Sequence, residues 1–315
     1  MAQNTYPVKK LVGVAIVRNE SDIIEIFVRY NLNVLDELHI IDNDSKDNTV
    51  EIIQSLQKEG LPVFLSHYPK RDHTQEFALN QLLRQLCVRD DIDFFFPLDA
   101  DELILSQSSD ELRSLLKNIP DAHCGRIYCE NHVCEATPKA NTDVFYQKMG
   151  WVREFEPKRP MGERIIIPFD LMRTHQLTAG NHFIKSLQPP HQYAPHIELP
   201  LALGHFPIRT KDQLIRKIIM GGLALQLKKN KIPMEGMHWL TLAEQLRNDH
   251  FQLTDEKFQY ISATYDAPRI TEHLSVVNRP IHHFDNVHQR YPSKTTTALV
   301  DLYDLTQQLI LTQKE

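Results

Sequence analysis

An apolar segment that leads straight into a group of carboxylates constrains this chain more than any other feature. Residues 94–98 read FFFPL, and Asp99, Asp101 and Glu102 follow within four positions. The apolar run predicts a buried strand, and ligands of open α/β sheets bind where such strands end. Carboxylates are costly to bury there without a cation, and a divalent metal ion is the usual one. An acidic N-terminus of the next helix is the alternative interpretation.

The first hundred residues alternate between apolar runs and helical stripes. Strands are expected over 11–17, 38–41, 61–65 and the segment before Asp99, with apolar residues at helical spacing between them. Ser21 or Asp22 is placed to cap the first helix, and Asp47 the second. This order predicts an α/β fold with a doubly wound, mostly parallel sheet flanked by helices and joined by right-handed crossovers.

The remainder of the chain has a different pattern. Residues 124–168 carry short β-like runs, and helical patterns return over 211–230, 239–247 and 297–311. No Pro/Gly-rich linker divides the chain. We therefore predict one α/β domain over residues 1–235 and a helical C-terminal extension over residues 236–315.

Composition limits the classes of partner and the cellular compartment. The 315 residues carry a formal net charge of −6 at pH 7, which argues against general affinity for nucleic acid or an anionic membrane. Four cysteines indicate a reducing compartment rather than a disulfide framework. The sequence shows no signal peptide, and no run approaches the roughly 20 apolar residues of a membrane span. We expect a cytoplasmic protein with at most peripheral membrane contact.

Four short motifs occur in order along the chain: 14–20 (VAIVRNE), 41–49 (IDNDSKDNT), 98–103 (LDADEL) and 204–210 (GHFPIRT, followed by Lys217). Together they resemble family 2-like glycosyltransferases of the GT-A fold, over residues 11–105 and 181–220. The resemblance implies metal-dependent transfer of a sugar, with inversion, from a nucleotide-sugar donor. By family expectation the donor is UDP-linked, and the acceptor is a glycan or lipid-linked glycan of an envelope or exopolysaccharide.

The resemblance also assigns roles to individual residues. Asp101 is expected to bind Mn²⁺ or Mg²⁺, and Asp99 to contact the ribose or a metal-bound water. His205 is expected to be a further metal ligand or a phosphate contact, with a turn histidine as the alternative. The residues expected to bind the nucleotide sugar are Glu20, Asp42, Asp44, Arg71, Asp99, Lys185 and Arg209. A solvated turn for Asp44 and a surface position for Arg71 are the alternatives.

An inverting transfer needs a base that deprotonates the acceptor hydroxyl. Many members of the resembled family place it in a Glu-Asp pair beyond the metal motif, and the corresponding stretch here has no such dipeptide. Glu154, after Trp151, is favoured, so Glu154 and Asp99 are the predicted catalytic residues. The other candidates for the base are Glu130, Glu156 and Glu163.

Two alternative functions stay open at this point. The absent Glu-Asp motif supports an inactive module of the same fold that binds nucleotide or glycan without turnover. A nucleotidyltransferase normally has a glycine-rich loop after its first strand, and Arg18-Asn19-Glu20 contains no glycine. The sequence does not indicate an oligomeric state.

Overall fold

The structure is a computed structural model of the chain. It describes residues 9–68, 75–134, 150–155, 162–227, 237–248, 252–265, 274–278, 287 and 289–294. The chain forms two compact units. Unit 1 comprises Met1–Glu130, Pro160–His205 and His282–Thr295, and unit 2 comprises Asn131–Arg159, Phe206–Ile281 and Thr296–Glu315. Compactness does not by itself locate a domain boundary, so the boundary expected after residue 235 stays a prediction.

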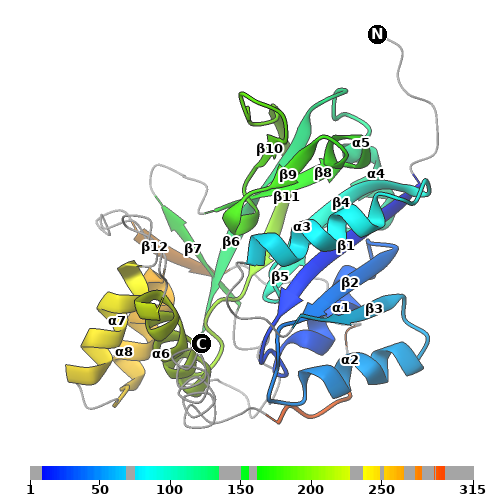
Figure 1. Cartoon of the computed structure of the whole chain (residues 1–315). Helices are drawn as coiled ribbons and strands as arrows, with labels where there is room; N and C mark the ends of the chain where they lie inside the picture. The colour runs from blue at the N-terminus through cyan, green and yellow to red at the C-terminus, as the bar shows by residue number, and fades with distance from the viewer. Residues whose placement is uncertain are drawn as a thin grey trace, which may run out of the picture. The chain divides into compact units, whose positions relative to one another are not determined.

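A mostly parallel sheet forms the centre of unit 1 (Figure 1). Its parallel strands are β1 (Lys10–Val17), β2 (Glu37–Asp42), β3 (Val63–His67) and β4 (Ile92–Leu98), in the order β3-β2-β1-β4. Strand β8 (Glu163–Pro168) is antiparallel to β4, and the first part of β6 (Cys124–Val133) is antiparallel to β8. The short strand β5 (Glu102–Ile104) pairs with the end of β11 (His196–His205).

Helices flank this sheet in the arrangement that right-handed crossovers require. Helices α1 (Ile24–Asn31) and α2 (Thr49–Lys58) connect β1 to β2 and β2 to β3, and α3 (Gln75–Leu86) returns from β3 to β4. Because the return runs in the opposite direction across the sheet, α3 covers the other face from α1 and α2. Helix α3 buries its apolar side in a core with β1 and β4. The predicted fold class is therefore confirmed.

The described part of unit 1 has five further short elements. They are α4 (Ser109–Leu116), α5 (Phe169–Met172), β9 (His175–Leu177), the 3₁₀ turn η2 (Ala179–Asn181) and β10 (Ile184–Ser186). Strands β9 and β10 pair as a small antiparallel hairpin on either side of η2. This hairpin therefore fixes the position of the η2 residues.

Two local predictions in unit 1 are wrong, and both have a physical reason. The third strand begins at Val63 rather than residue 61, because Gly60 (φ 86°) ends α2 and the Leu61 N–H still bonds to the Leu56 carbonyl. Helix α1 begins after Ile23, whose side chain makes no capping bond, so neither Ser21 nor Asp22 is its N-cap.

The described part of unit 2 combines a small antiparallel sheet with three helices. Strand β7 (Trp151–Phe155) pairs with the end of β6 and with β12 (Leu274–Asn278). Helix α6 (Lys211–Leu227) packs against α7 (Met237–Asn248). Buried Arg153 donates to the carbonyl oxygens of Ala263, at 3.1 Å, and Tyr265, and so binds carbonyls left open at the end of α8 (Asp255–Thr264).

The helices predicted over 211–230 and 239–247 are confirmed by α6 and α7. Strand β12 lies in the region predicted to be helical, and its two β-branched valines favour the extended conformation. The helix predicted over 297–311 lies outside the described residues. The C-terminal part of the chain therefore contains both helix and strand.

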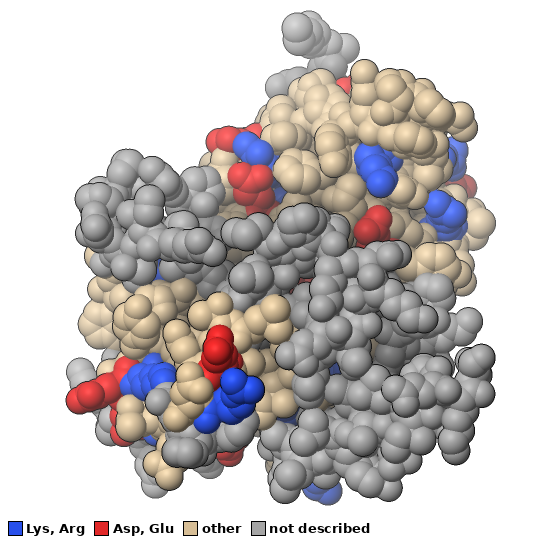
Figure 2. Space-filling view, turned by 60° about the vertical axis from the view of Figure 1, so that its left-hand side comes forward, with Lys and Arg blue, Asp and Glu red and all other residues tan. Residues whose placement is uncertain are grey.

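The described surface offers neither a membrane span nor a continuous basic face in the view of Figure 2. None of the described helices is long and apolar enough to cross a membrane. On the face that Figure 2 shows, described basic side chains lie singly or beside acidic ones. Binding to a nucleic-acid backbone typically uses a clustered basic patch.

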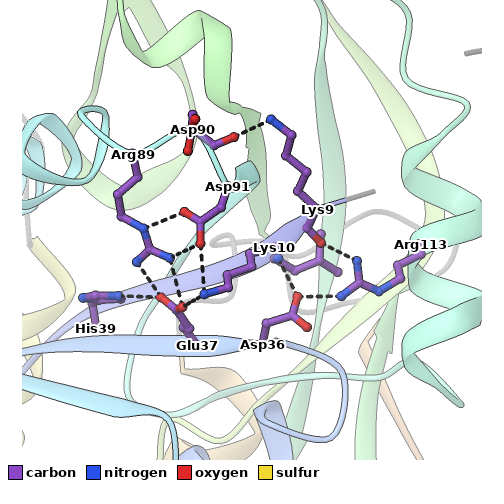
Figure 3. Close-up of polar contacts among 10 residues, drawn as sticks. Lys9, Lys10, Asp36, Glu37, His39, Arg89, Asp90, Asp91 and Arg113 are labelled. Atoms are coloured by element: carbon purple, nitrogen blue, oxygen red, sulfur yellow. Dashed lines mark hydrogen bonds and ion pairs between the residues drawn. The ribbon is translucent and has the colours of Figure 1, made fainter. Parts of the chain in front are cut away.

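A nearly buried carboxylate connects the starts of β1 and β2 to the loop before β4 (Figure 3). Glu37 accepts hydrogen bonds from Arg89 at 2.7 and 2.9 Å and pairs with Lys10 at 2.5 Å. Arg89 also bonds to Asp91 at 2.8 and 2.9 Å. Chiefly because of Arg89, the pKa of Glu37 falls from its usual 4.5 to about 2. This cluster fixes the ends of the strands opposite the polar edge.

Replacing Glu37 by Gln is expected to lower the free energy of unfolding by about 2 kcal/mol at neutral pH, because its side chain is only 8% exposed and Arg89 and Lys10 each lose one of their two acidic partners, keeping only Asp91. A carboxyl whose pKa is lowered by folding stabilises above its unfolded pKa, and the contribution is lost as pH falls. The difference between wild type and Glu37→Gln should therefore shrink between about pH 4.5 and about pH 2.

Urea unfolding across this pH range measures the effect. Glu244→Gln, an exposed substitution in α7, is the matched control and should change stability by less than about 0.5 kcal/mol. A difference between wild type and Glu37→Gln that does not vary with pH would contradict the prediction.

Candidate active site

Polar residues from three parallel strands of unit 1 meet at one edge of the sheet. Asp42 is the last residue of β2, Glu20 follows β1, and Asp99 and Asp101 follow β4. Parallel neighbours present their carboxyl ends at the same edge, and the Asn43 N–H bonds to the Val17 carbonyl at 2.9 Å there. The structure therefore brings together the acidic residues of the first three motifs.

Two loops at this edge, which we call the rim loops, are bonded to each other. Rim loop 1 is residues 18–23 after β1, and rim loop 2 is residues 43–48 after β2. The bonds join Asn19 to Ser45 (2.9 Å) and Lys46 (2.7 Å), Glu20 to Thr49 at the start of α2 (2.9 Å), and Ser21 to Asp47 (3.1 Å). Asn19 and Asp44 have φ values of 55° and 62°, which Asn and Asp tolerate better than most residues. The rim loops are thus ordered as one unit.

The acidic residues at the end of β2 and in rim loop 2 already have partners. Asp42 is 2% exposed, accepts from the Ser45 N–H at 3.3 Å and pairs with His67 Nδ1 at 3.1 Å. Asp44 pairs with Lys46 at 2.9 Å. Asp47 accepts the Thr49 N–H at 3.0 Å at the start of α2, but the N-cap residue of this helix is Asn48, so Asp47 is not the cap that was predicted. These contacts fix the direction of each carboxylate.

The second carboxylate of the D-x-D motif lies beside a histidine. Asp101 Oδ1 is 3.7 Å from Nε2 of His205, and both side chains are largely buried. The β5–β11 pairing places His205 opposite Glu102, so the sheet itself sets this distance. Two atoms bound to one small divalent ion lie at most about 4.2 Å apart, since each bond is about 2.1 Å. The Asp101–His205 pair therefore fits two ligands of one ion.

The first carboxylate of the motif, Asp99, is held by different neighbours. Arg164 Nη2, from β8, donates to Asp99 Oδ2 at 2.9 Å and lies 2.6 Å from Glu102 Oε1. Asn181 Nδ2 donates to Asp99 Oδ1 at 3.3 Å. Gly180 and Asn181 have φ values of 78° and 60°, and this left-handed turn presents the amide to Asp99. Asp99 and Asp101 thus have separate partners.

Glu102 closes the D-x-D turn from inside the fold. Its side chain is fully buried, and its Oε2 accepts the Asp99 N–H at 2.9 Å. Burial raises the pKa of Glu102, and the Arg164 guanidinium opposes this rise. The charge on Glu102 therefore depends on Arg164.

Sequence reasoning missed Arg164 and Asn181. The sequence did contain a hint of the role of Arg164, because this arginine directly precedes the apolar run Ile165-Ile166-Ile167. An arginine next to a buried strand needs an acidic partner inside the fold. Asn181 follows Gly180, a pair that is typical of a left-handed turn. Neither pattern identifies the residue to which Arg164 or Asn181 bonds.

The other predicted site residues are placed as follows. Lys185 lies in β10, four positions beyond Asn181. In unit 2, Arg209 is 1% exposed and donates to the Phe206 carbonyl at 3.2 Å, and Glu154 lies in β7 opposite Ser275. Arg71 lies outside the described residues. The roles of all four stay predictions.

Among the other candidates for the base, Glu163 pairs with Arg126 at 2.9 Å and Glu130 lies in β6. Glu156 lies outside the described residues. In the described part of the chain, no group of three or more His, Cys, Asp or Glu side chains is arranged to hold a metal ion. The metal-binding role of Asp101 and His205 therefore stays a prediction.

Comparison with known protein families assigns the chain. Residues 14–172 match the model of glycosyl transferase family 2. The chain belongs to glycosyl transferase family 2. In this glycosyltransferase the matched region runs from β1 to α5 and includes both rim loops, the D-x-D turn and Arg164. The resemblance seen in the motifs, and with it the enzyme class, is confirmed. No curated protein matches this chain in sequence.

Several solved structures are similar to this glycosyltransferase over most of its length at low sequence identity. They include S. aureus TarS 1–349 (14% identity, TM-score 0.38, 77% of this chain and 72% of that chain). The mannosyltransferase PcManGT from Pyrobaculum calidifontis, in complex with GDP-Man and Mn²⁺, has 15% identity and a TM-score of 0.42, covering 84% and 73%. GalNAc-T7 with UDP, GalNAc and Mn²⁺ has 13% identity and a TM-score of 0.39, covering 84% and 58%. At these TM-scores the assignment rests on the family match alone.

Replacing Arg164 by Met is expected to lower the free energy of unfolding by about 3–5 kcal/mol, because it leaves Glu102 buried without a cation. The double variant Glu102→Gln/Arg164→Met should recover part of this loss, since it removes the unpaired acid as well. Urea unfolding of the three proteins measures both effects.

Arg113→Met is the matched control, because Arg113 pairs with the more exposed Asp36. This variant should cost about 1 kcal/mol or less. Equal losses for Arg113→Met and Arg164→Met would contradict a special role of the Arg164–Glu102 pair.

Proposed function

We propose that this glycosyltransferase transfers a sugar from a nucleotide-sugar donor to a glycan acceptor, with a divalent metal ion bound by Asp101 and His205. The observation that carries the proposal is the 3.7 Å approach of these two side chains, in a family 2 chain, at the carboxyl edge of a parallel sheet. Ligands of such sheets bind at this edge.

The donor atoms of the pair fit Mn²⁺ or Mg²⁺. A carboxylate oxygen suits both ions, and an imidazole nitrogen beside it is acceptable to a first-row ion such as Mn²⁺. Ions of this kind often use only one or two protein ligands, and substrate phosphates and water take the other positions. When bound, the ion supplies Lewis-acid stabilisation of the diphosphate that leaves the sugar.

The rim loops and Asp99 suit the nucleoside part of the donor. Carboxylates accept hydrogen bonds from ribose hydroxyls and from the N–H groups of a base. We assign Asp42, Asp44 and Glu20 to the base and ribose. Asp99 is held at both oxygens by Arg164 and Asn181, and we assign its remaining lone pairs to a ribose hydroxyl or a metal-bound water.

The remaining assignments concern the phosphates and the acceptor. Lys185, Arg209 and Arg71 carry the positive charge that a diphosphate requires, and the planar fork of arginine suits phosphate oxygens. Glu154 is proposed as the base that takes the proton of the acceptor hydroxyl as its oxygen attacks the anomeric carbon. A single displacement of this kind inverts the configuration. A UDP-linked donor, an envelope glycan acceptor and a cytoplasmic location remain parts of this proposal.

Asp101→Ala is expected to abolish metal-dependent binding of the donor nucleotide and to lower sugar transfer by at least about 100-fold, with the fold retained. Thermal unfolding with UDP, GDP, CMP and dTDP, each with and without Mn²⁺, measures binding, because a ligand of the native state raises its stability. The wild type should be stabilised by one nucleotide in a metal-dependent way.

Asp121→Ala, an exposed residue, is the matched control and should behave as wild type. Metal-dependent stabilisation that survives in Asp101→Ala would overturn the metal assignment. A wild type that binds nucleotide with Mn²⁺ and transfers no sugar to any glycan would favour the inactive-module alternative.

His205→Ala separates a metal ligand from a turn histidine. Loss of a ligand should weaken Mn²⁺ binding by at least as much as loss of an outer contact, about 10–100-fold. Mn²⁺ titration followed by electron paramagnetic resonance, with nucleotide present, measures the affinity directly. An unchanged Mn²⁺ affinity in a folded His205→Ala protein would identify His205 as a structural residue of the turn.

A further inference from the structure

A short segment near the C-terminus, residues 289–294, belongs to unit 1, and we call it the strap. The segments on both sides of it in sequence, which end at Ile281 and begin at Thr296, belong to unit 2. In Figure 1 the strap is the orange-red segment beside α2. The strap is therefore a short C-terminal segment that belongs to the unit carrying the rim loops.

The inner side of the strap is bonded to both rim loops. Both polar atoms of the Asn48 side chain, in rim loop 2, bond to the strap. Nδ2 donates to the Pro292 carbonyl at 2.9 Å, and Oδ1 accepts the Lys294 N–H at 2.7 Å. Ser21 of rim loop 1 is buried, and its Oγ lies 2.8 Å from Ser293 Oγ. Each rim loop thus has a side chain committed to the strap.

Neither of these two side chains caps a helix. Asn48 is the N-cap residue of α2, yet it makes no side-chain capping bond. Ser21, one of the two residues predicted to cap α1, does not cap it either. A capping side chain contributes roughly 1 kcal/mol to helix stability. Here these groups bond instead to residues more than 240 positions away.

The outer end of the strap is held independently of the rim loops. Glu25 of α1 is fully buried, and its Oε2 accepts the N–H groups of Arg290 at 2.9 Å and Tyr291 at 2.8 Å. Its Oε1 pairs with Arg29 at 2.9 Å. A buried carboxylate is costly unless it is bonded in this way. The Tyr291 hydroxyl reaches Glu59 at 2.6 Å.

We propose that the strap positions the donor site: by holding Ser21 and Asn48 it fixes both rim loops and thereby sets the affinity for the donor's nucleotide. The inference rests on the proposed function of the rim loops as the nucleoside-binding part. Because Asn19 and Ser21 also bond to rim loop 2, a shift of either loop is passed to the other. A site that is ordered before binding loses less entropy on binding. Ser293 and Lys294 are positioning residues in this scheme.

The test leaves the rim residues unchanged and alters the strap. Ser293→Ala removes the hydroxyl that bonds to Ser21, and Lys294→Pro removes the N–H that bonds to Asn48. The double variant should raise the Kd for UDP with Mn²⁺, or for whichever of UDP, GDP, CMP and dTDP the wild type binds, by about tenfold. The KM for the donor should rise in parallel, with kcat changed by less than about twofold, because the transfer step itself is not altered.

Three further variants keep the result interpretable. Ser293→Ala alone, which avoids a new proline, should give a smaller rise in Kd. Ser293→Thr keeps a hydroxyl and should restore wild-type affinity. Tyr291→Phe alters only the outer end of the strap and should leave the Kd unchanged. Urea unfolding of each variant shows whether the fold is retained.

The possible outcomes distinguish a failure of the strap inference from a failure of the proposed function. A wild type that binds none of the four nucleotides, with or without Mn²⁺, would overturn the proposed function itself. A wild type that binds one of them, together with strap variants that bind it equally well, would overturn the strap inference and leave the function standing. Strap variants with a lower kcat and an unchanged Kd would also overturn it.

Discussion

The burial of carboxylates at one edge of a parallel sheet is the constraint on which the rest of unit 1 depends. Asp42 is 2% exposed at the end of β2, Glu102 is fully buried at the start of β5, and Asp99 follows β4. An acid in such a place needs a donor or cation from another element, and each acid here has one: His67 from β3 for Asp42, and Arg164 from β8 for Glu102 and Asp99. The acidic motif therefore depends on the antiparallel strand β8, because β8 carries Arg164.

The D-x-D motif works as a turn whose two acids have different environments. Glu102 closes this turn twice, because its N–H bonds to the Asp99 carbonyl at 3.1 Å and its carboxylate accepts the Asp99 N–H. The closed turn directs Asp99 to a guanidinium and an amide, and Asp101 to an imidazole. Arg164 already pairs with Asp99, which is why the proposed metal ion is assigned to Asp101. The acid after the D-x-D pair is therefore part of the same structural unit.

The sequence was enough to predict what depends on short-range pattern. The apolar runs of β1, β2 and β4 and the stripe of α3 predict the sheet, and the right-handed rule then places Asp42, Asp99 and Asp101 at one edge. The partners of these acids could not be predicted, because Arg164 reaches Asp99 only through the pairing of β8 with β4. The partner of Ser21 could not be predicted either. Its local sequence suggested a helix cap, whereas its hydroxyl bonds to Ser293, 272 positions away.

The region that matches the family model ends at residue 172, and several contacts that complete the edge come from beyond it. Asn181 bonds to Asp99, His205 lies beside Asp101, and Ser293 and Lys294 bond to the rim loops. The matched region thus supplies the acids together with His67 and Arg164, and the later chain supplies the other groups that contact them. Selectivity for one substrate over another depends on the orientation of such groups as much as on their identity. The features that distinguish this glycosyltransferase from other members of family 2 should therefore be sought between η2 and the strap.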